Sequence, residues 1–224
     1  MTGTIVNTAA IIAGGLLGLL LGHGIPQRLS ESVMKGLGLC TVFIGITGMF
    51  DGENTLITVL SVALGALLGE TLDLQGHTER LGAKLEQRYS HGKSGSFAQG
   101  FLTASLLFCI GTMAITGAIQ DGLYGNSEIL FTKSIMDGIS SILFASSLGF
   151  GVLFSAIPLF LVQGSIAMLA SAAVSILEPA MGEINSVGSI LLLGLGLNLT
   201  GIGQFKIMNY IPALFLPILF CRFF

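Results

Sequence analysis

Charged residues are scarce in this 224-residue sequence, since Asp, Glu, Lys and Arg together make up 9% of it. A soluble domain of average composition carries about 25%. Hydrophobic residues make up 52%, and the mean hydropathy is +0.89. The shortage of charge excludes an ordinary soluble enzyme and a disordered chain. It predicts an all-α, polytopic transmembrane helical bundle embedded in a lipid bilayer.

Basic residues and cysteines are also few. Nine Lys and Arg against twelve Asp and Glu leave a net charge of −3, so no nucleic-acid partner is expected. Cys40, Cys109 and Cys221 lie in apolar runs without a C-x-x-C pair, which excludes a disulfide scaffold and predicts packing roles. The first basic residue is Arg28, which follows the first apolar run. A signal peptide would have a basic segment before its apolar run, so this run is expected to be a retained span.

Motifs that carry enzymatic chemistry are missing from the sequence. It contains no P-loop, H-E-x-x-H, G-x-S-x-G or paired C-x-x-C motif, and its three histidines lie in or beside predicted loops. We therefore expect neither enzymatic activity nor a cofactor. The sequence leaves a metal site unassigned.

Apolar runs of about 20 residues predict the membrane spans. The uncharged stretch 138–177 would form a helix of about 60 Å, twice the bilayer core, so it is expected to fold back near 146–151. A polar loop, 73–96, contains a predicted helix at 78–89 that is either a solvated connector or a surface helix on lipid headgroups. Charges and turn residues divide the chain into eight predicted spans, with seven as the alternative: 4–21, 33–50, 56–72, 97–119, 129–148, 152–174, 187–203 and 207–221.

Basic residues predict the orientation, because cytoplasmic loops carry an excess of Lys and Arg. With the N-terminus outside, Lys133 and Arg222 are external, and both termini are expected outside. The predicted outer loops carry acidic residues, Asp121 and Glu183 among them. The remaining basic residues are then cytoplasmic: Arg28, Lys35, Arg80, Lys84, Arg88, Lys93 and Lys206.

Two segments resemble each other within the chain. LGLCTVFIGITG at 37–48 and LLFCIGTMAITG at 106–117 share five residues at an offset of 69, and 191–201 is a weaker copy. In the predicted topology the third copy runs in the opposite sense. A single transmembrane domain, 1–224, then has inverted repeat halves at 1–72 and 152–224, with the spans of 97–148 between them. Such repeats are common in secondary transporters, although Gly- and Leu-rich helices also resemble one another by chance.

Polar residues inside predicted spans are candidate functional residues, because they are costly in a bilayer. Lys133 and Asp137 are four residues apart on one helical face and form either a coupling-ion site or an interfacial ion pair. Glu70 ends the run LGALLGE, where it either faces a cavity or marks the interface. Gln163 lies mid-span as an interhelical hydrogen-bonding group or as part of a pathway.

Threonine, asparagine and glycine suggest three further features. Asn198 and Thr200, next to Gly201, either free carbonyl groups for an ion or stabilise a packed kink. Thr47 and Thr116 are equivalent positions of the two similar segments and are candidates to line a pathway. Glycines also recur every fourth residue, which predicts close helix packing inside one chain or between subunits, at Gly14, Gly18 and Gly22 and at Gly65 and Gly69.

Five segments carry a resemblance to a known family: GTIVNTAAIIAGGLLGLLLG, IPQRLSESVMKGLGLCTVFIGI, TASLLFCIGTMAITGAIQDGL, ILFTKSIMDGISSILFASSLGFGVLFSAIP and GLGLNLTGIGQFKIMNYIPAL. Together they resemble the YdfK/YqgA-type bacterial inner-membrane family, a domain of unknown function, over nearly the whole chain. The resemblance implies a multi-pass helical protein of the bacterial plasma membrane. It implies no substrate and no functional residues.

The leading hypothesis is a small secondary transporter or permease, coupled to protons or cations, for a small solute or ion. Thr47, Thr116, Asn198 and Thr200 would line its pathway, and Glu70, Asp137 and Gln163 would bind or relay the ion. One alternative is a homo-oligomeric channel joined through the glycine stripes. Another is a regulatory or assembly subunit that transports nothing.

Overall fold

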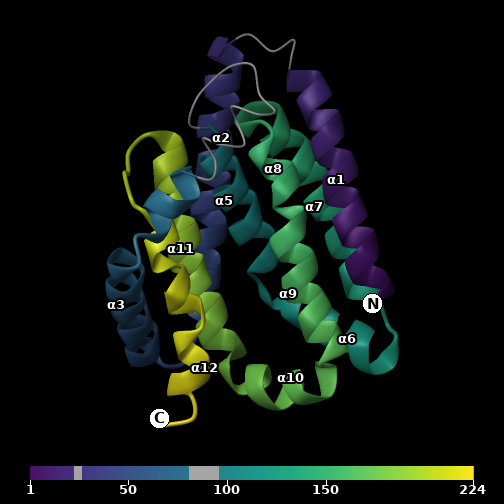
Figure 1. The fold of residues 1–224 in the computed structure, drawn as a ribbon, viewed down its shortest axis with the longest axis vertical. Coiled ribbons are helices and arrows are strands. Elements are labelled where there is room, and N and C mark those ends of the chain that lie inside the picture. Colours follow the sequence, from purple (N-terminus) through teal and green to yellow (C-terminus); the bar gives the residue numbers. More distant parts are fainter. Residues whose placement is uncertain (23–26, 81–95, 224) are drawn as a thin grey trace. The chain divides into compact units, whose positions relative to one another are not determined.

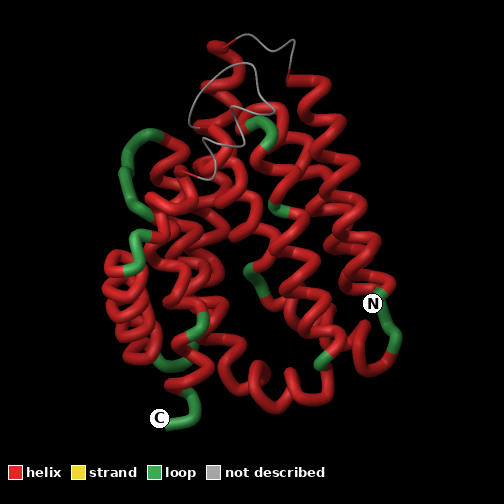
Figure 2. Tube along the Cα trace, viewed as in Figure 1, coloured by secondary structure: helices red, strands yellow, loops and turns green. Residues whose placement is uncertain are grey.

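The computed structural model describes residues 1–22, 27–80 and 96–223, and these ranges contain helices and loops but no strand (Figure 2). Five helices in this part of the chain are long and apolar enough to cross a membrane, or up to seven if each of two bent pairs counts as one span. The contacts divide the chain into two compact units. Unit 1 consists of Met1–Met34 and Leu81–Ala173, and unit 2 of Lys35–Arg80 and Val174–Phe224.

A pair of parallel helices, α1 (Thr2–Gly22) and α7 (Glu128–Leu148), lies side by side in unit 1 (Figure 1). A Cβ atom at Gly14 would collide with the carbonyl of Gly138, and one at Gly18 with the carbonyl of Ile142. Glycine at every fourth position therefore presents a bare backbone strip on which α7 packs. The first glycine stripe is thus engaged inside the chain.

The chain turns back after α7, as the sequence predicts. The helix ends at Leu148, and Gly149 adopts a φ of +77° that glycine tolerates without steric cost. A short helix, α8 (Gly151–Phe154), packs on α5 (Ser96–Cys109), with the rings of Phe97 and Phe154 5.4 Å apart. The chain continues through α9 (Ala156–Met168) and α10 (Ala170–Leu177).

The prediction of one continuous helix over 97–119 is wrong. The segment consists of α5 (Ser96–Cys109) and α6 (Thr112–Tyr124), which meet at a bend of 58°. Gly111 lies in the bend with a φ of +121°, a conformation that residues with a Cβ atom rarely adopt. A glycine therefore permits the break, and α6 then packs on α7 beyond the following turn.

Unit 2 contains α2 (Gln27–Gly48) from Lys35 onward and α11 (Met181–Thr200), which run antiparallel. Gly38 lies against the carbonyl of Gly196, and Gly48 lies against the side chain of Ser189. A short 3₁₀ helix, η1 (Met49–Asp51), follows α2. Another, η2 (Glu178–Ala180), precedes α11.

The second glycine stripe lies on α3 (Thr55–Thr71), which packs antiparallel to η3 (Ile207–Leu214). Gly65 faces Ala213, and Gly69 lies against the backbone of Asn209. This stripe is also engaged inside the chain. Both stripes of the channel hypothesis are therefore covered by helices of the same molecule and are not available as a subunit interface.

The last predicted span, 207–221, is the weakest of the eight. It consists of the 3₁₀ helix η3 and α12 (Leu216–Phe220), with Pro212 and Pro217 in the two segments. The apolar segment Ile207–Phe220 is shorter than the roughly 17 to 25 residues that a span needs. Proline removes a backbone donor and interrupts the helical ladder. The described ranges therefore contain five to seven candidate spans. This corrects the predicted eight and includes the alternative of seven.

Two further boundaries differ from the prediction. α3 bends by 53° into a helical segment, Leu74–Arg80, so the predicted helix at 78–89 begins in described residues and otherwise lies outside them. α11 begins at Met181 rather than near residue 187. The earlier start places Glu183 and Asn185 inside the helix, where both are buried.

Candidate functional site

A buried polar cluster joins three helices of unit 1. The ammonium group of Lys133 lies 2.9 Å from the carboxylate of Asp137, and both residues are at most 7% exposed. The side-chain amide of Asn7 on α1 donates to the same carboxylate at 3.0 Å. It also reaches the amide oxygen of Gln163 on α9 at 3.5 Å. We call Asn7, Lys133, Asp137 and Gln163 the buried cluster.

The buried cluster lies deep along its helices. Asp137 is the tenth residue of the 21-residue α7, about 14 Å from the helix start at 1.5 Å per residue. Lys133 is one turn closer to that start. Burying two charged side chains at such depth costs free energy unless they pair with each other and are hydrogen-bonded. In a membrane helix, such residues are functional candidates by default.

The two amides of the cluster retain unused hydrogen-bonding capacity. Asn7 and Gln163 are both 0% exposed. The amide oxygen of Asn7 and the amide nitrogen of Gln163 have no hydrogen-bond partner. Buried polar atoms normally find a partner, so each exception calls for an explanation such as a water molecule or an ion.

The break between α5 and α6 lies at the level of Asp137. Gly117 on α6 packs against Leu130 on α7, across the turn that joins these helices. Counting at 1.5 Å per residue, Gly111 lies about 9 Å from this contact and Asp137 about 10 Å from it, in the same direction. Broken helices expose backbone groups that bind ions in secondary transporters.

Asp121 lies in the last turn of α6 rather than in the predicted outer loop, and there it is 3% exposed and anchors the α6–α7 turn. Its carboxylate accepts hydrogen bonds from the hydroxyl of Ser127 at 2.7 Å and the backbone N–H of Gly3 at 3.1 Å. The α-amino group of Met1 lies 3.0 Å from it. These contacts fix the start of α1 beside the turn, which sets the register that brings Asn7 to Asp137.

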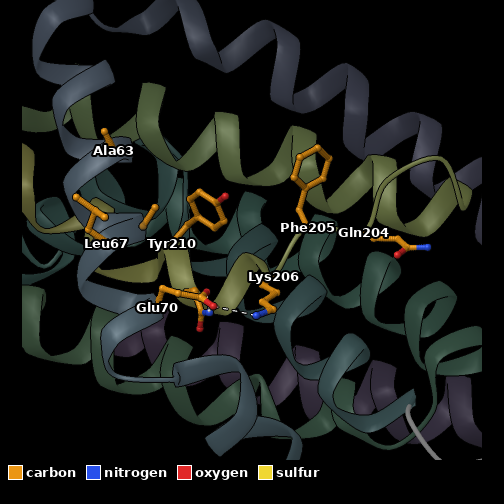
Figure 3. Close-up of a pocket in the computed structure, with 9 residues that line it drawn as sticks. Ala63, Leu67, Glu70, Gln204, Phe205, Lys206 and Tyr210 are labelled. Carbon is orange, nitrogen blue, oxygen red and sulfur yellow. Dashed lines mark hydrogen bonds and ion pairs between the residues drawn. The ribbon is translucent and has the colours of Figure 1, made fainter.

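A second polar site, in unit 2, is an open pocket of about 480 Å³. Figure 3 shows Glu70 and Lys206 pointing toward each other on the wall of this pocket, which Phe205 and Tyr210 also line. The ion pair spans 2.9 Å, and both side chains are about 60% exposed. Glu70 therefore lies on a pocket wall and pairs with a lysine.

Asn209 organises the same pocket. Its amide group donates to Glu70 at 2.5 Å, and its amide oxygen accepts the backbone N–H of Gln75 at 2.7 Å. It thereby connects η3 to the bend that follows α3. The hydrogen bond and the negative charge of Glu70 raise the pKa of Lys206 above its usual value.

A third polar group joins α11 to the start of α3 within unit 2. The carboxylate of Glu183 is 5% exposed and accepts hydrogen bonds from the backbone N–H of Asn54 at 2.7 Å and the hydroxyl of Thr58 at 3.0 Å. Asn185 donates to Asp51. The prediction that Glu183 is an outer-loop residue is therefore wrong, because α11 begins before it.

The remaining predicted site residues do not converge on one place. Thr47 is exposed, and its hydroxyl donates to the carbonyl of Ile44 in its own helix. Asn198 bridges to both backbone groups of Phe205, and Thr200 donates to the carbonyl of Leu197. Thr116 is half-buried in unit 1. Thr116, Asp137 and Gln163 thus lie in unit 1, and the other four lie in unit 2.

Asn7, Lys206 and Asn209 complete the two sites, although sequence reasoning gave them little weight. Asn7 and Asn209 are isolated amides in apolar segments, which is a weak signal because many such amides only stabilise packing. Their spacing does not reveal that each contacts an acidic residue more than 100 positions away. Among the described residues, no group of three or more His, Cys, Asp or Glu side chains could hold a metal ion.

Comparison with known proteins identifies relatives of the whole chain. A family described as "Protein of unknown function (DUF554)" matches residues 2–222. The uncharacterized membrane protein YdfK of Bacillus subtilis is 36% identical over 97% of this chain and 94% of its own length. The uncharacterized protein YqgA of Escherichia coli is 34% identical over 96% and 93%. No solved structure matches. With its apolar helices, the chain is a multi-pass membrane protein with bacterial relatives.

Proposed function

We propose that this chain, which belongs to the DUF554 family, is a small secondary transporter of the bacterial plasma membrane that couples a small solute or ion to a proton or cation gradient. The observation that carries the proposal is the pair of Lys133 and Asp137, buried at mid-helix depth with two amides beside it. A packed bundle gains little from such a pair, because burying two charges removes their hydration. Binding and release of a cation gives it a use.

The broken helix supports the same proposal. α5 and α6 separate at Gly111, at the level of Asp137, and the bend there is 58°. Interrupted helices near the bilayer centre form the substrate and ion sites of many transporters. The pathway assigned to Thr116, Asp137 and Gln163 in unit 1 passes this break.

The packing within the units is compatible with the predicted inverted repeats. The halves 1–72 and 152–224 relate α1 to α9, α2 to α11, and α3 to η3 with α12. Both members of each pair lie in the same unit for these segments, and each pair is in contact. Two of the pairs run antiparallel, as an inverted repeat requires. The repeat remains part of the proposal.

The pocket beside Glu70 indicates the size of the cargo. Its volume of about 480 Å³ lies within the range of roughly 300 to 1,000 Å³ that small-molecule sites occupy. Its wall carries one acidic group, one basic group and two aromatic rings. A small polar solute fits such a wall. We therefore assign Glu70, which the sequence predicted to bind or relay the ion, to contact with the solute.

The test is transport by the purified chain in liposomes that contain a pH-sensitive dye. Gradients of H⁺, Na⁺ or K⁺ are imposed, and pools of small neutral, anionic and cationic solutes are added. We expect gradient-driven uptake or antiport that Asp137→Asn reduces at least tenfold, while the exposed control Glu178→Gln retains it. Equal flux in Asp137→Asn and the unmodified chain would overturn coupling at Asp137. Conductance without coupling would favour the channel. Absence of flux together with a co-purifying protein would favour the regulatory or assembly subunit.

A further inference from the structure

The three helices of the buried cluster supply oxygen atoms around one carboxylate. Asp137 on α7 provides two, Asn7 on α1 provides an unpartnered amide oxygen, and Gln163 on α9 provides an amide oxygen within 3.5 Å of the Asn7 amide. Carboxylate and amide oxygens are the ligands that hard metal cations prefer. All three residues are at most 6% exposed, so water cannot readily compete for these positions.

A cation already occupies this position in the structure, because the ammonium group of Lys133 lies 2.9 Å from the carboxylate. Lys133 and Asp137 differ in their freedom to move away. Lys133 is the sixth residue of α7, about 8 Å from the helix start, and its four-carbon stem lets the charge extend toward the interface. Asp137 is one turn deeper and its side chain is short. The pair can therefore open only by departure of the lysine.

We propose that Asp137, Asn7 and Gln163 form a binding site for a monovalent metal cation of the size of Na⁺, which exchanges with the ammonium group of Lys133. This inference rests on the proposed function, since it identifies the coupling ion. When Lys133 withdraws, Asp137 is left with a negative charge that needs another cation at that depth. Rotation of the Asn7 amide then directs its oxygen, which has no partner while Lys133 is in place, toward the incoming ion.

The oxygen set favours a metal cation over a proton. A proton occupies a single oxygen of Asp137 and needs at most one hydrogen-bond acceptor. A metal cation uses the carboxylate and both amides, which converge from three separate helices. The exchange keeps the charge of the site balanced, because one positive charge enters as another withdraws.

The first experiment measures equilibrium binding of ²²Na⁺ to the purified full-length chain at fixed pH and ionic strength. We expect one saturable site. Asp137→Asn is expected to abolish it, and Asn7→Leu to weaken it at least tenfold. The matched control is Lys35→Met, which removes an exposed lysine of α2 outside both polar sites and is expected to leave ²²Na⁺ binding unchanged.

Lys133→Met distinguishes ion exchange from a purely structural ion pair. If Lys133 competes for the site, its removal tightens ²²Na⁺ binding at least tenfold and makes the unfolding temperature rise more steeply with Na⁺ than with K⁺ or choline. A structural pair predicts lower stability in all three salts to the same extent. If Lys133→Met does not fold, Lys133→Gln serves the same comparison.

Absence of saturable ²²Na⁺ binding in the unmodified chain would overturn the inference whatever the variants do. This failure is distinguishable from failure of the proposed function. If the unmodified chain does not bind Na⁺ but Asp137→Asn loses flux, the proposed transporter stands and its coupling ion is a proton or K⁺. If the unmodified chain binds Na⁺ but shows no flux, the cation site stands and the transporter proposal fails.

Discussion

Glu183, the third residue of α11, holds the first turn of α3 by accepting the backbone N–H of Asn54 at 2.7 Å. Asn54 is also the N-cap of α3, and its side chain accepts the N–H of Leu56 at 3.1 Å. A helix start leaves several backbone donors without partners inside the helix. Glu183 therefore satisfies a donor that the cap itself cannot reach, and it connects two helices of unit 2.

Glu183→Ala should destabilise the protein by about 1–3 kcal/mol, since it removes the acceptor of the half-buried Asn54 N–H and leaves the buried Thr58 hydroxyl only its longer hydrogen bond to Ser186. The free energy of unfolding in detergent measures this change. Glu178→Ala, five residues earlier and exposed in η2, is the control and should have little effect. Equal stability of both variants would contradict the assigned role of Glu183.

Gly18→Ala should destabilise the α1–α7 pair by about 1–3 kcal/mol, because the added methyl group collides with the carbonyl of Ile142. Gly36→Ala in α2 is the matched control, because no atom lies within 4 Å of a Cβ atom there. It should be neutral or stabilise by about 0.5–1 kcal/mol, since alanine favours the helix. Thermal unfolding monitored by circular dichroism compares the two, and loss of stability in Gly36→Ala alone would refute the packing assignment.

Removing one member of the buried ion pair should cost more than removing both. Lys133→Met or Asp137→Asn alone should destabilise by about 3–5 kcal/mol, because each leaves buried polar or charged groups without their partner. The double variant should recover much of this loss, because the unpaired charge is gone. A double-mutant cycle on the free energy of unfolding measures the coupling. Additive effects would show that the two side chains do not interact.

Backbone conformation alone should distinguish Gly111 from Gly125. Neither has an atom within 4 Å of a Cβ position, but Gly111 has a φ of +121° and Gly125 a φ of +66°. Asparagine tolerates the second conformation, whereas residues other than glycine rarely adopt the first. Gly111→Ala should therefore destabilise by about 1–3 kcal/mol, and Gly125→Asn should be near neutral. Equal unfolding free energies would mean that the break after α5 does not need glycine.

Glu70→Gln should lower the pKa of Lys206 toward its ordinary value, because the hydrogen bond and charge of Glu70 raise it. A raised folded-state pKa stabilises the fold below the ordinary lysine pKa, and that contribution disappears as the pH rises through the folded value. The window therefore lies in the alkaline range, and neutral pH leaves the pair intact. The pH dependence of Lys206 acetylation, followed by mass spectrometry, measures the shift. If the pH profile of acetylation were unchanged in Glu70→Gln, Glu70 would not influence the pKa of Lys206.

Local patterns in the sequence predicted several features correctly. The shortage of charge predicted a helical membrane protein, and the small residues near Gly149 predicted the turn after α7. The spacing of Lys133 and Asp137 predicted their ion pair. The predicted helix boundaries failed where a single residue overrode the apolar pattern, as Gly111 and the two prolines near the C-terminus do.

Helical periodicity is a local property, so the sequence by itself determined which residues share a helix face: the glycine stripe of α1 and the pair Lys133 and Asp137. Only the tertiary structure decided what those faces meet, because partner choice depends on the fit between helices far apart in the chain. Asn7 reaches Asp137 across 130 positions, and Glu183 reaches Asn54 across 129. Each of these contacts requires a close approach of two backbones, which depends on every side chain in the interface.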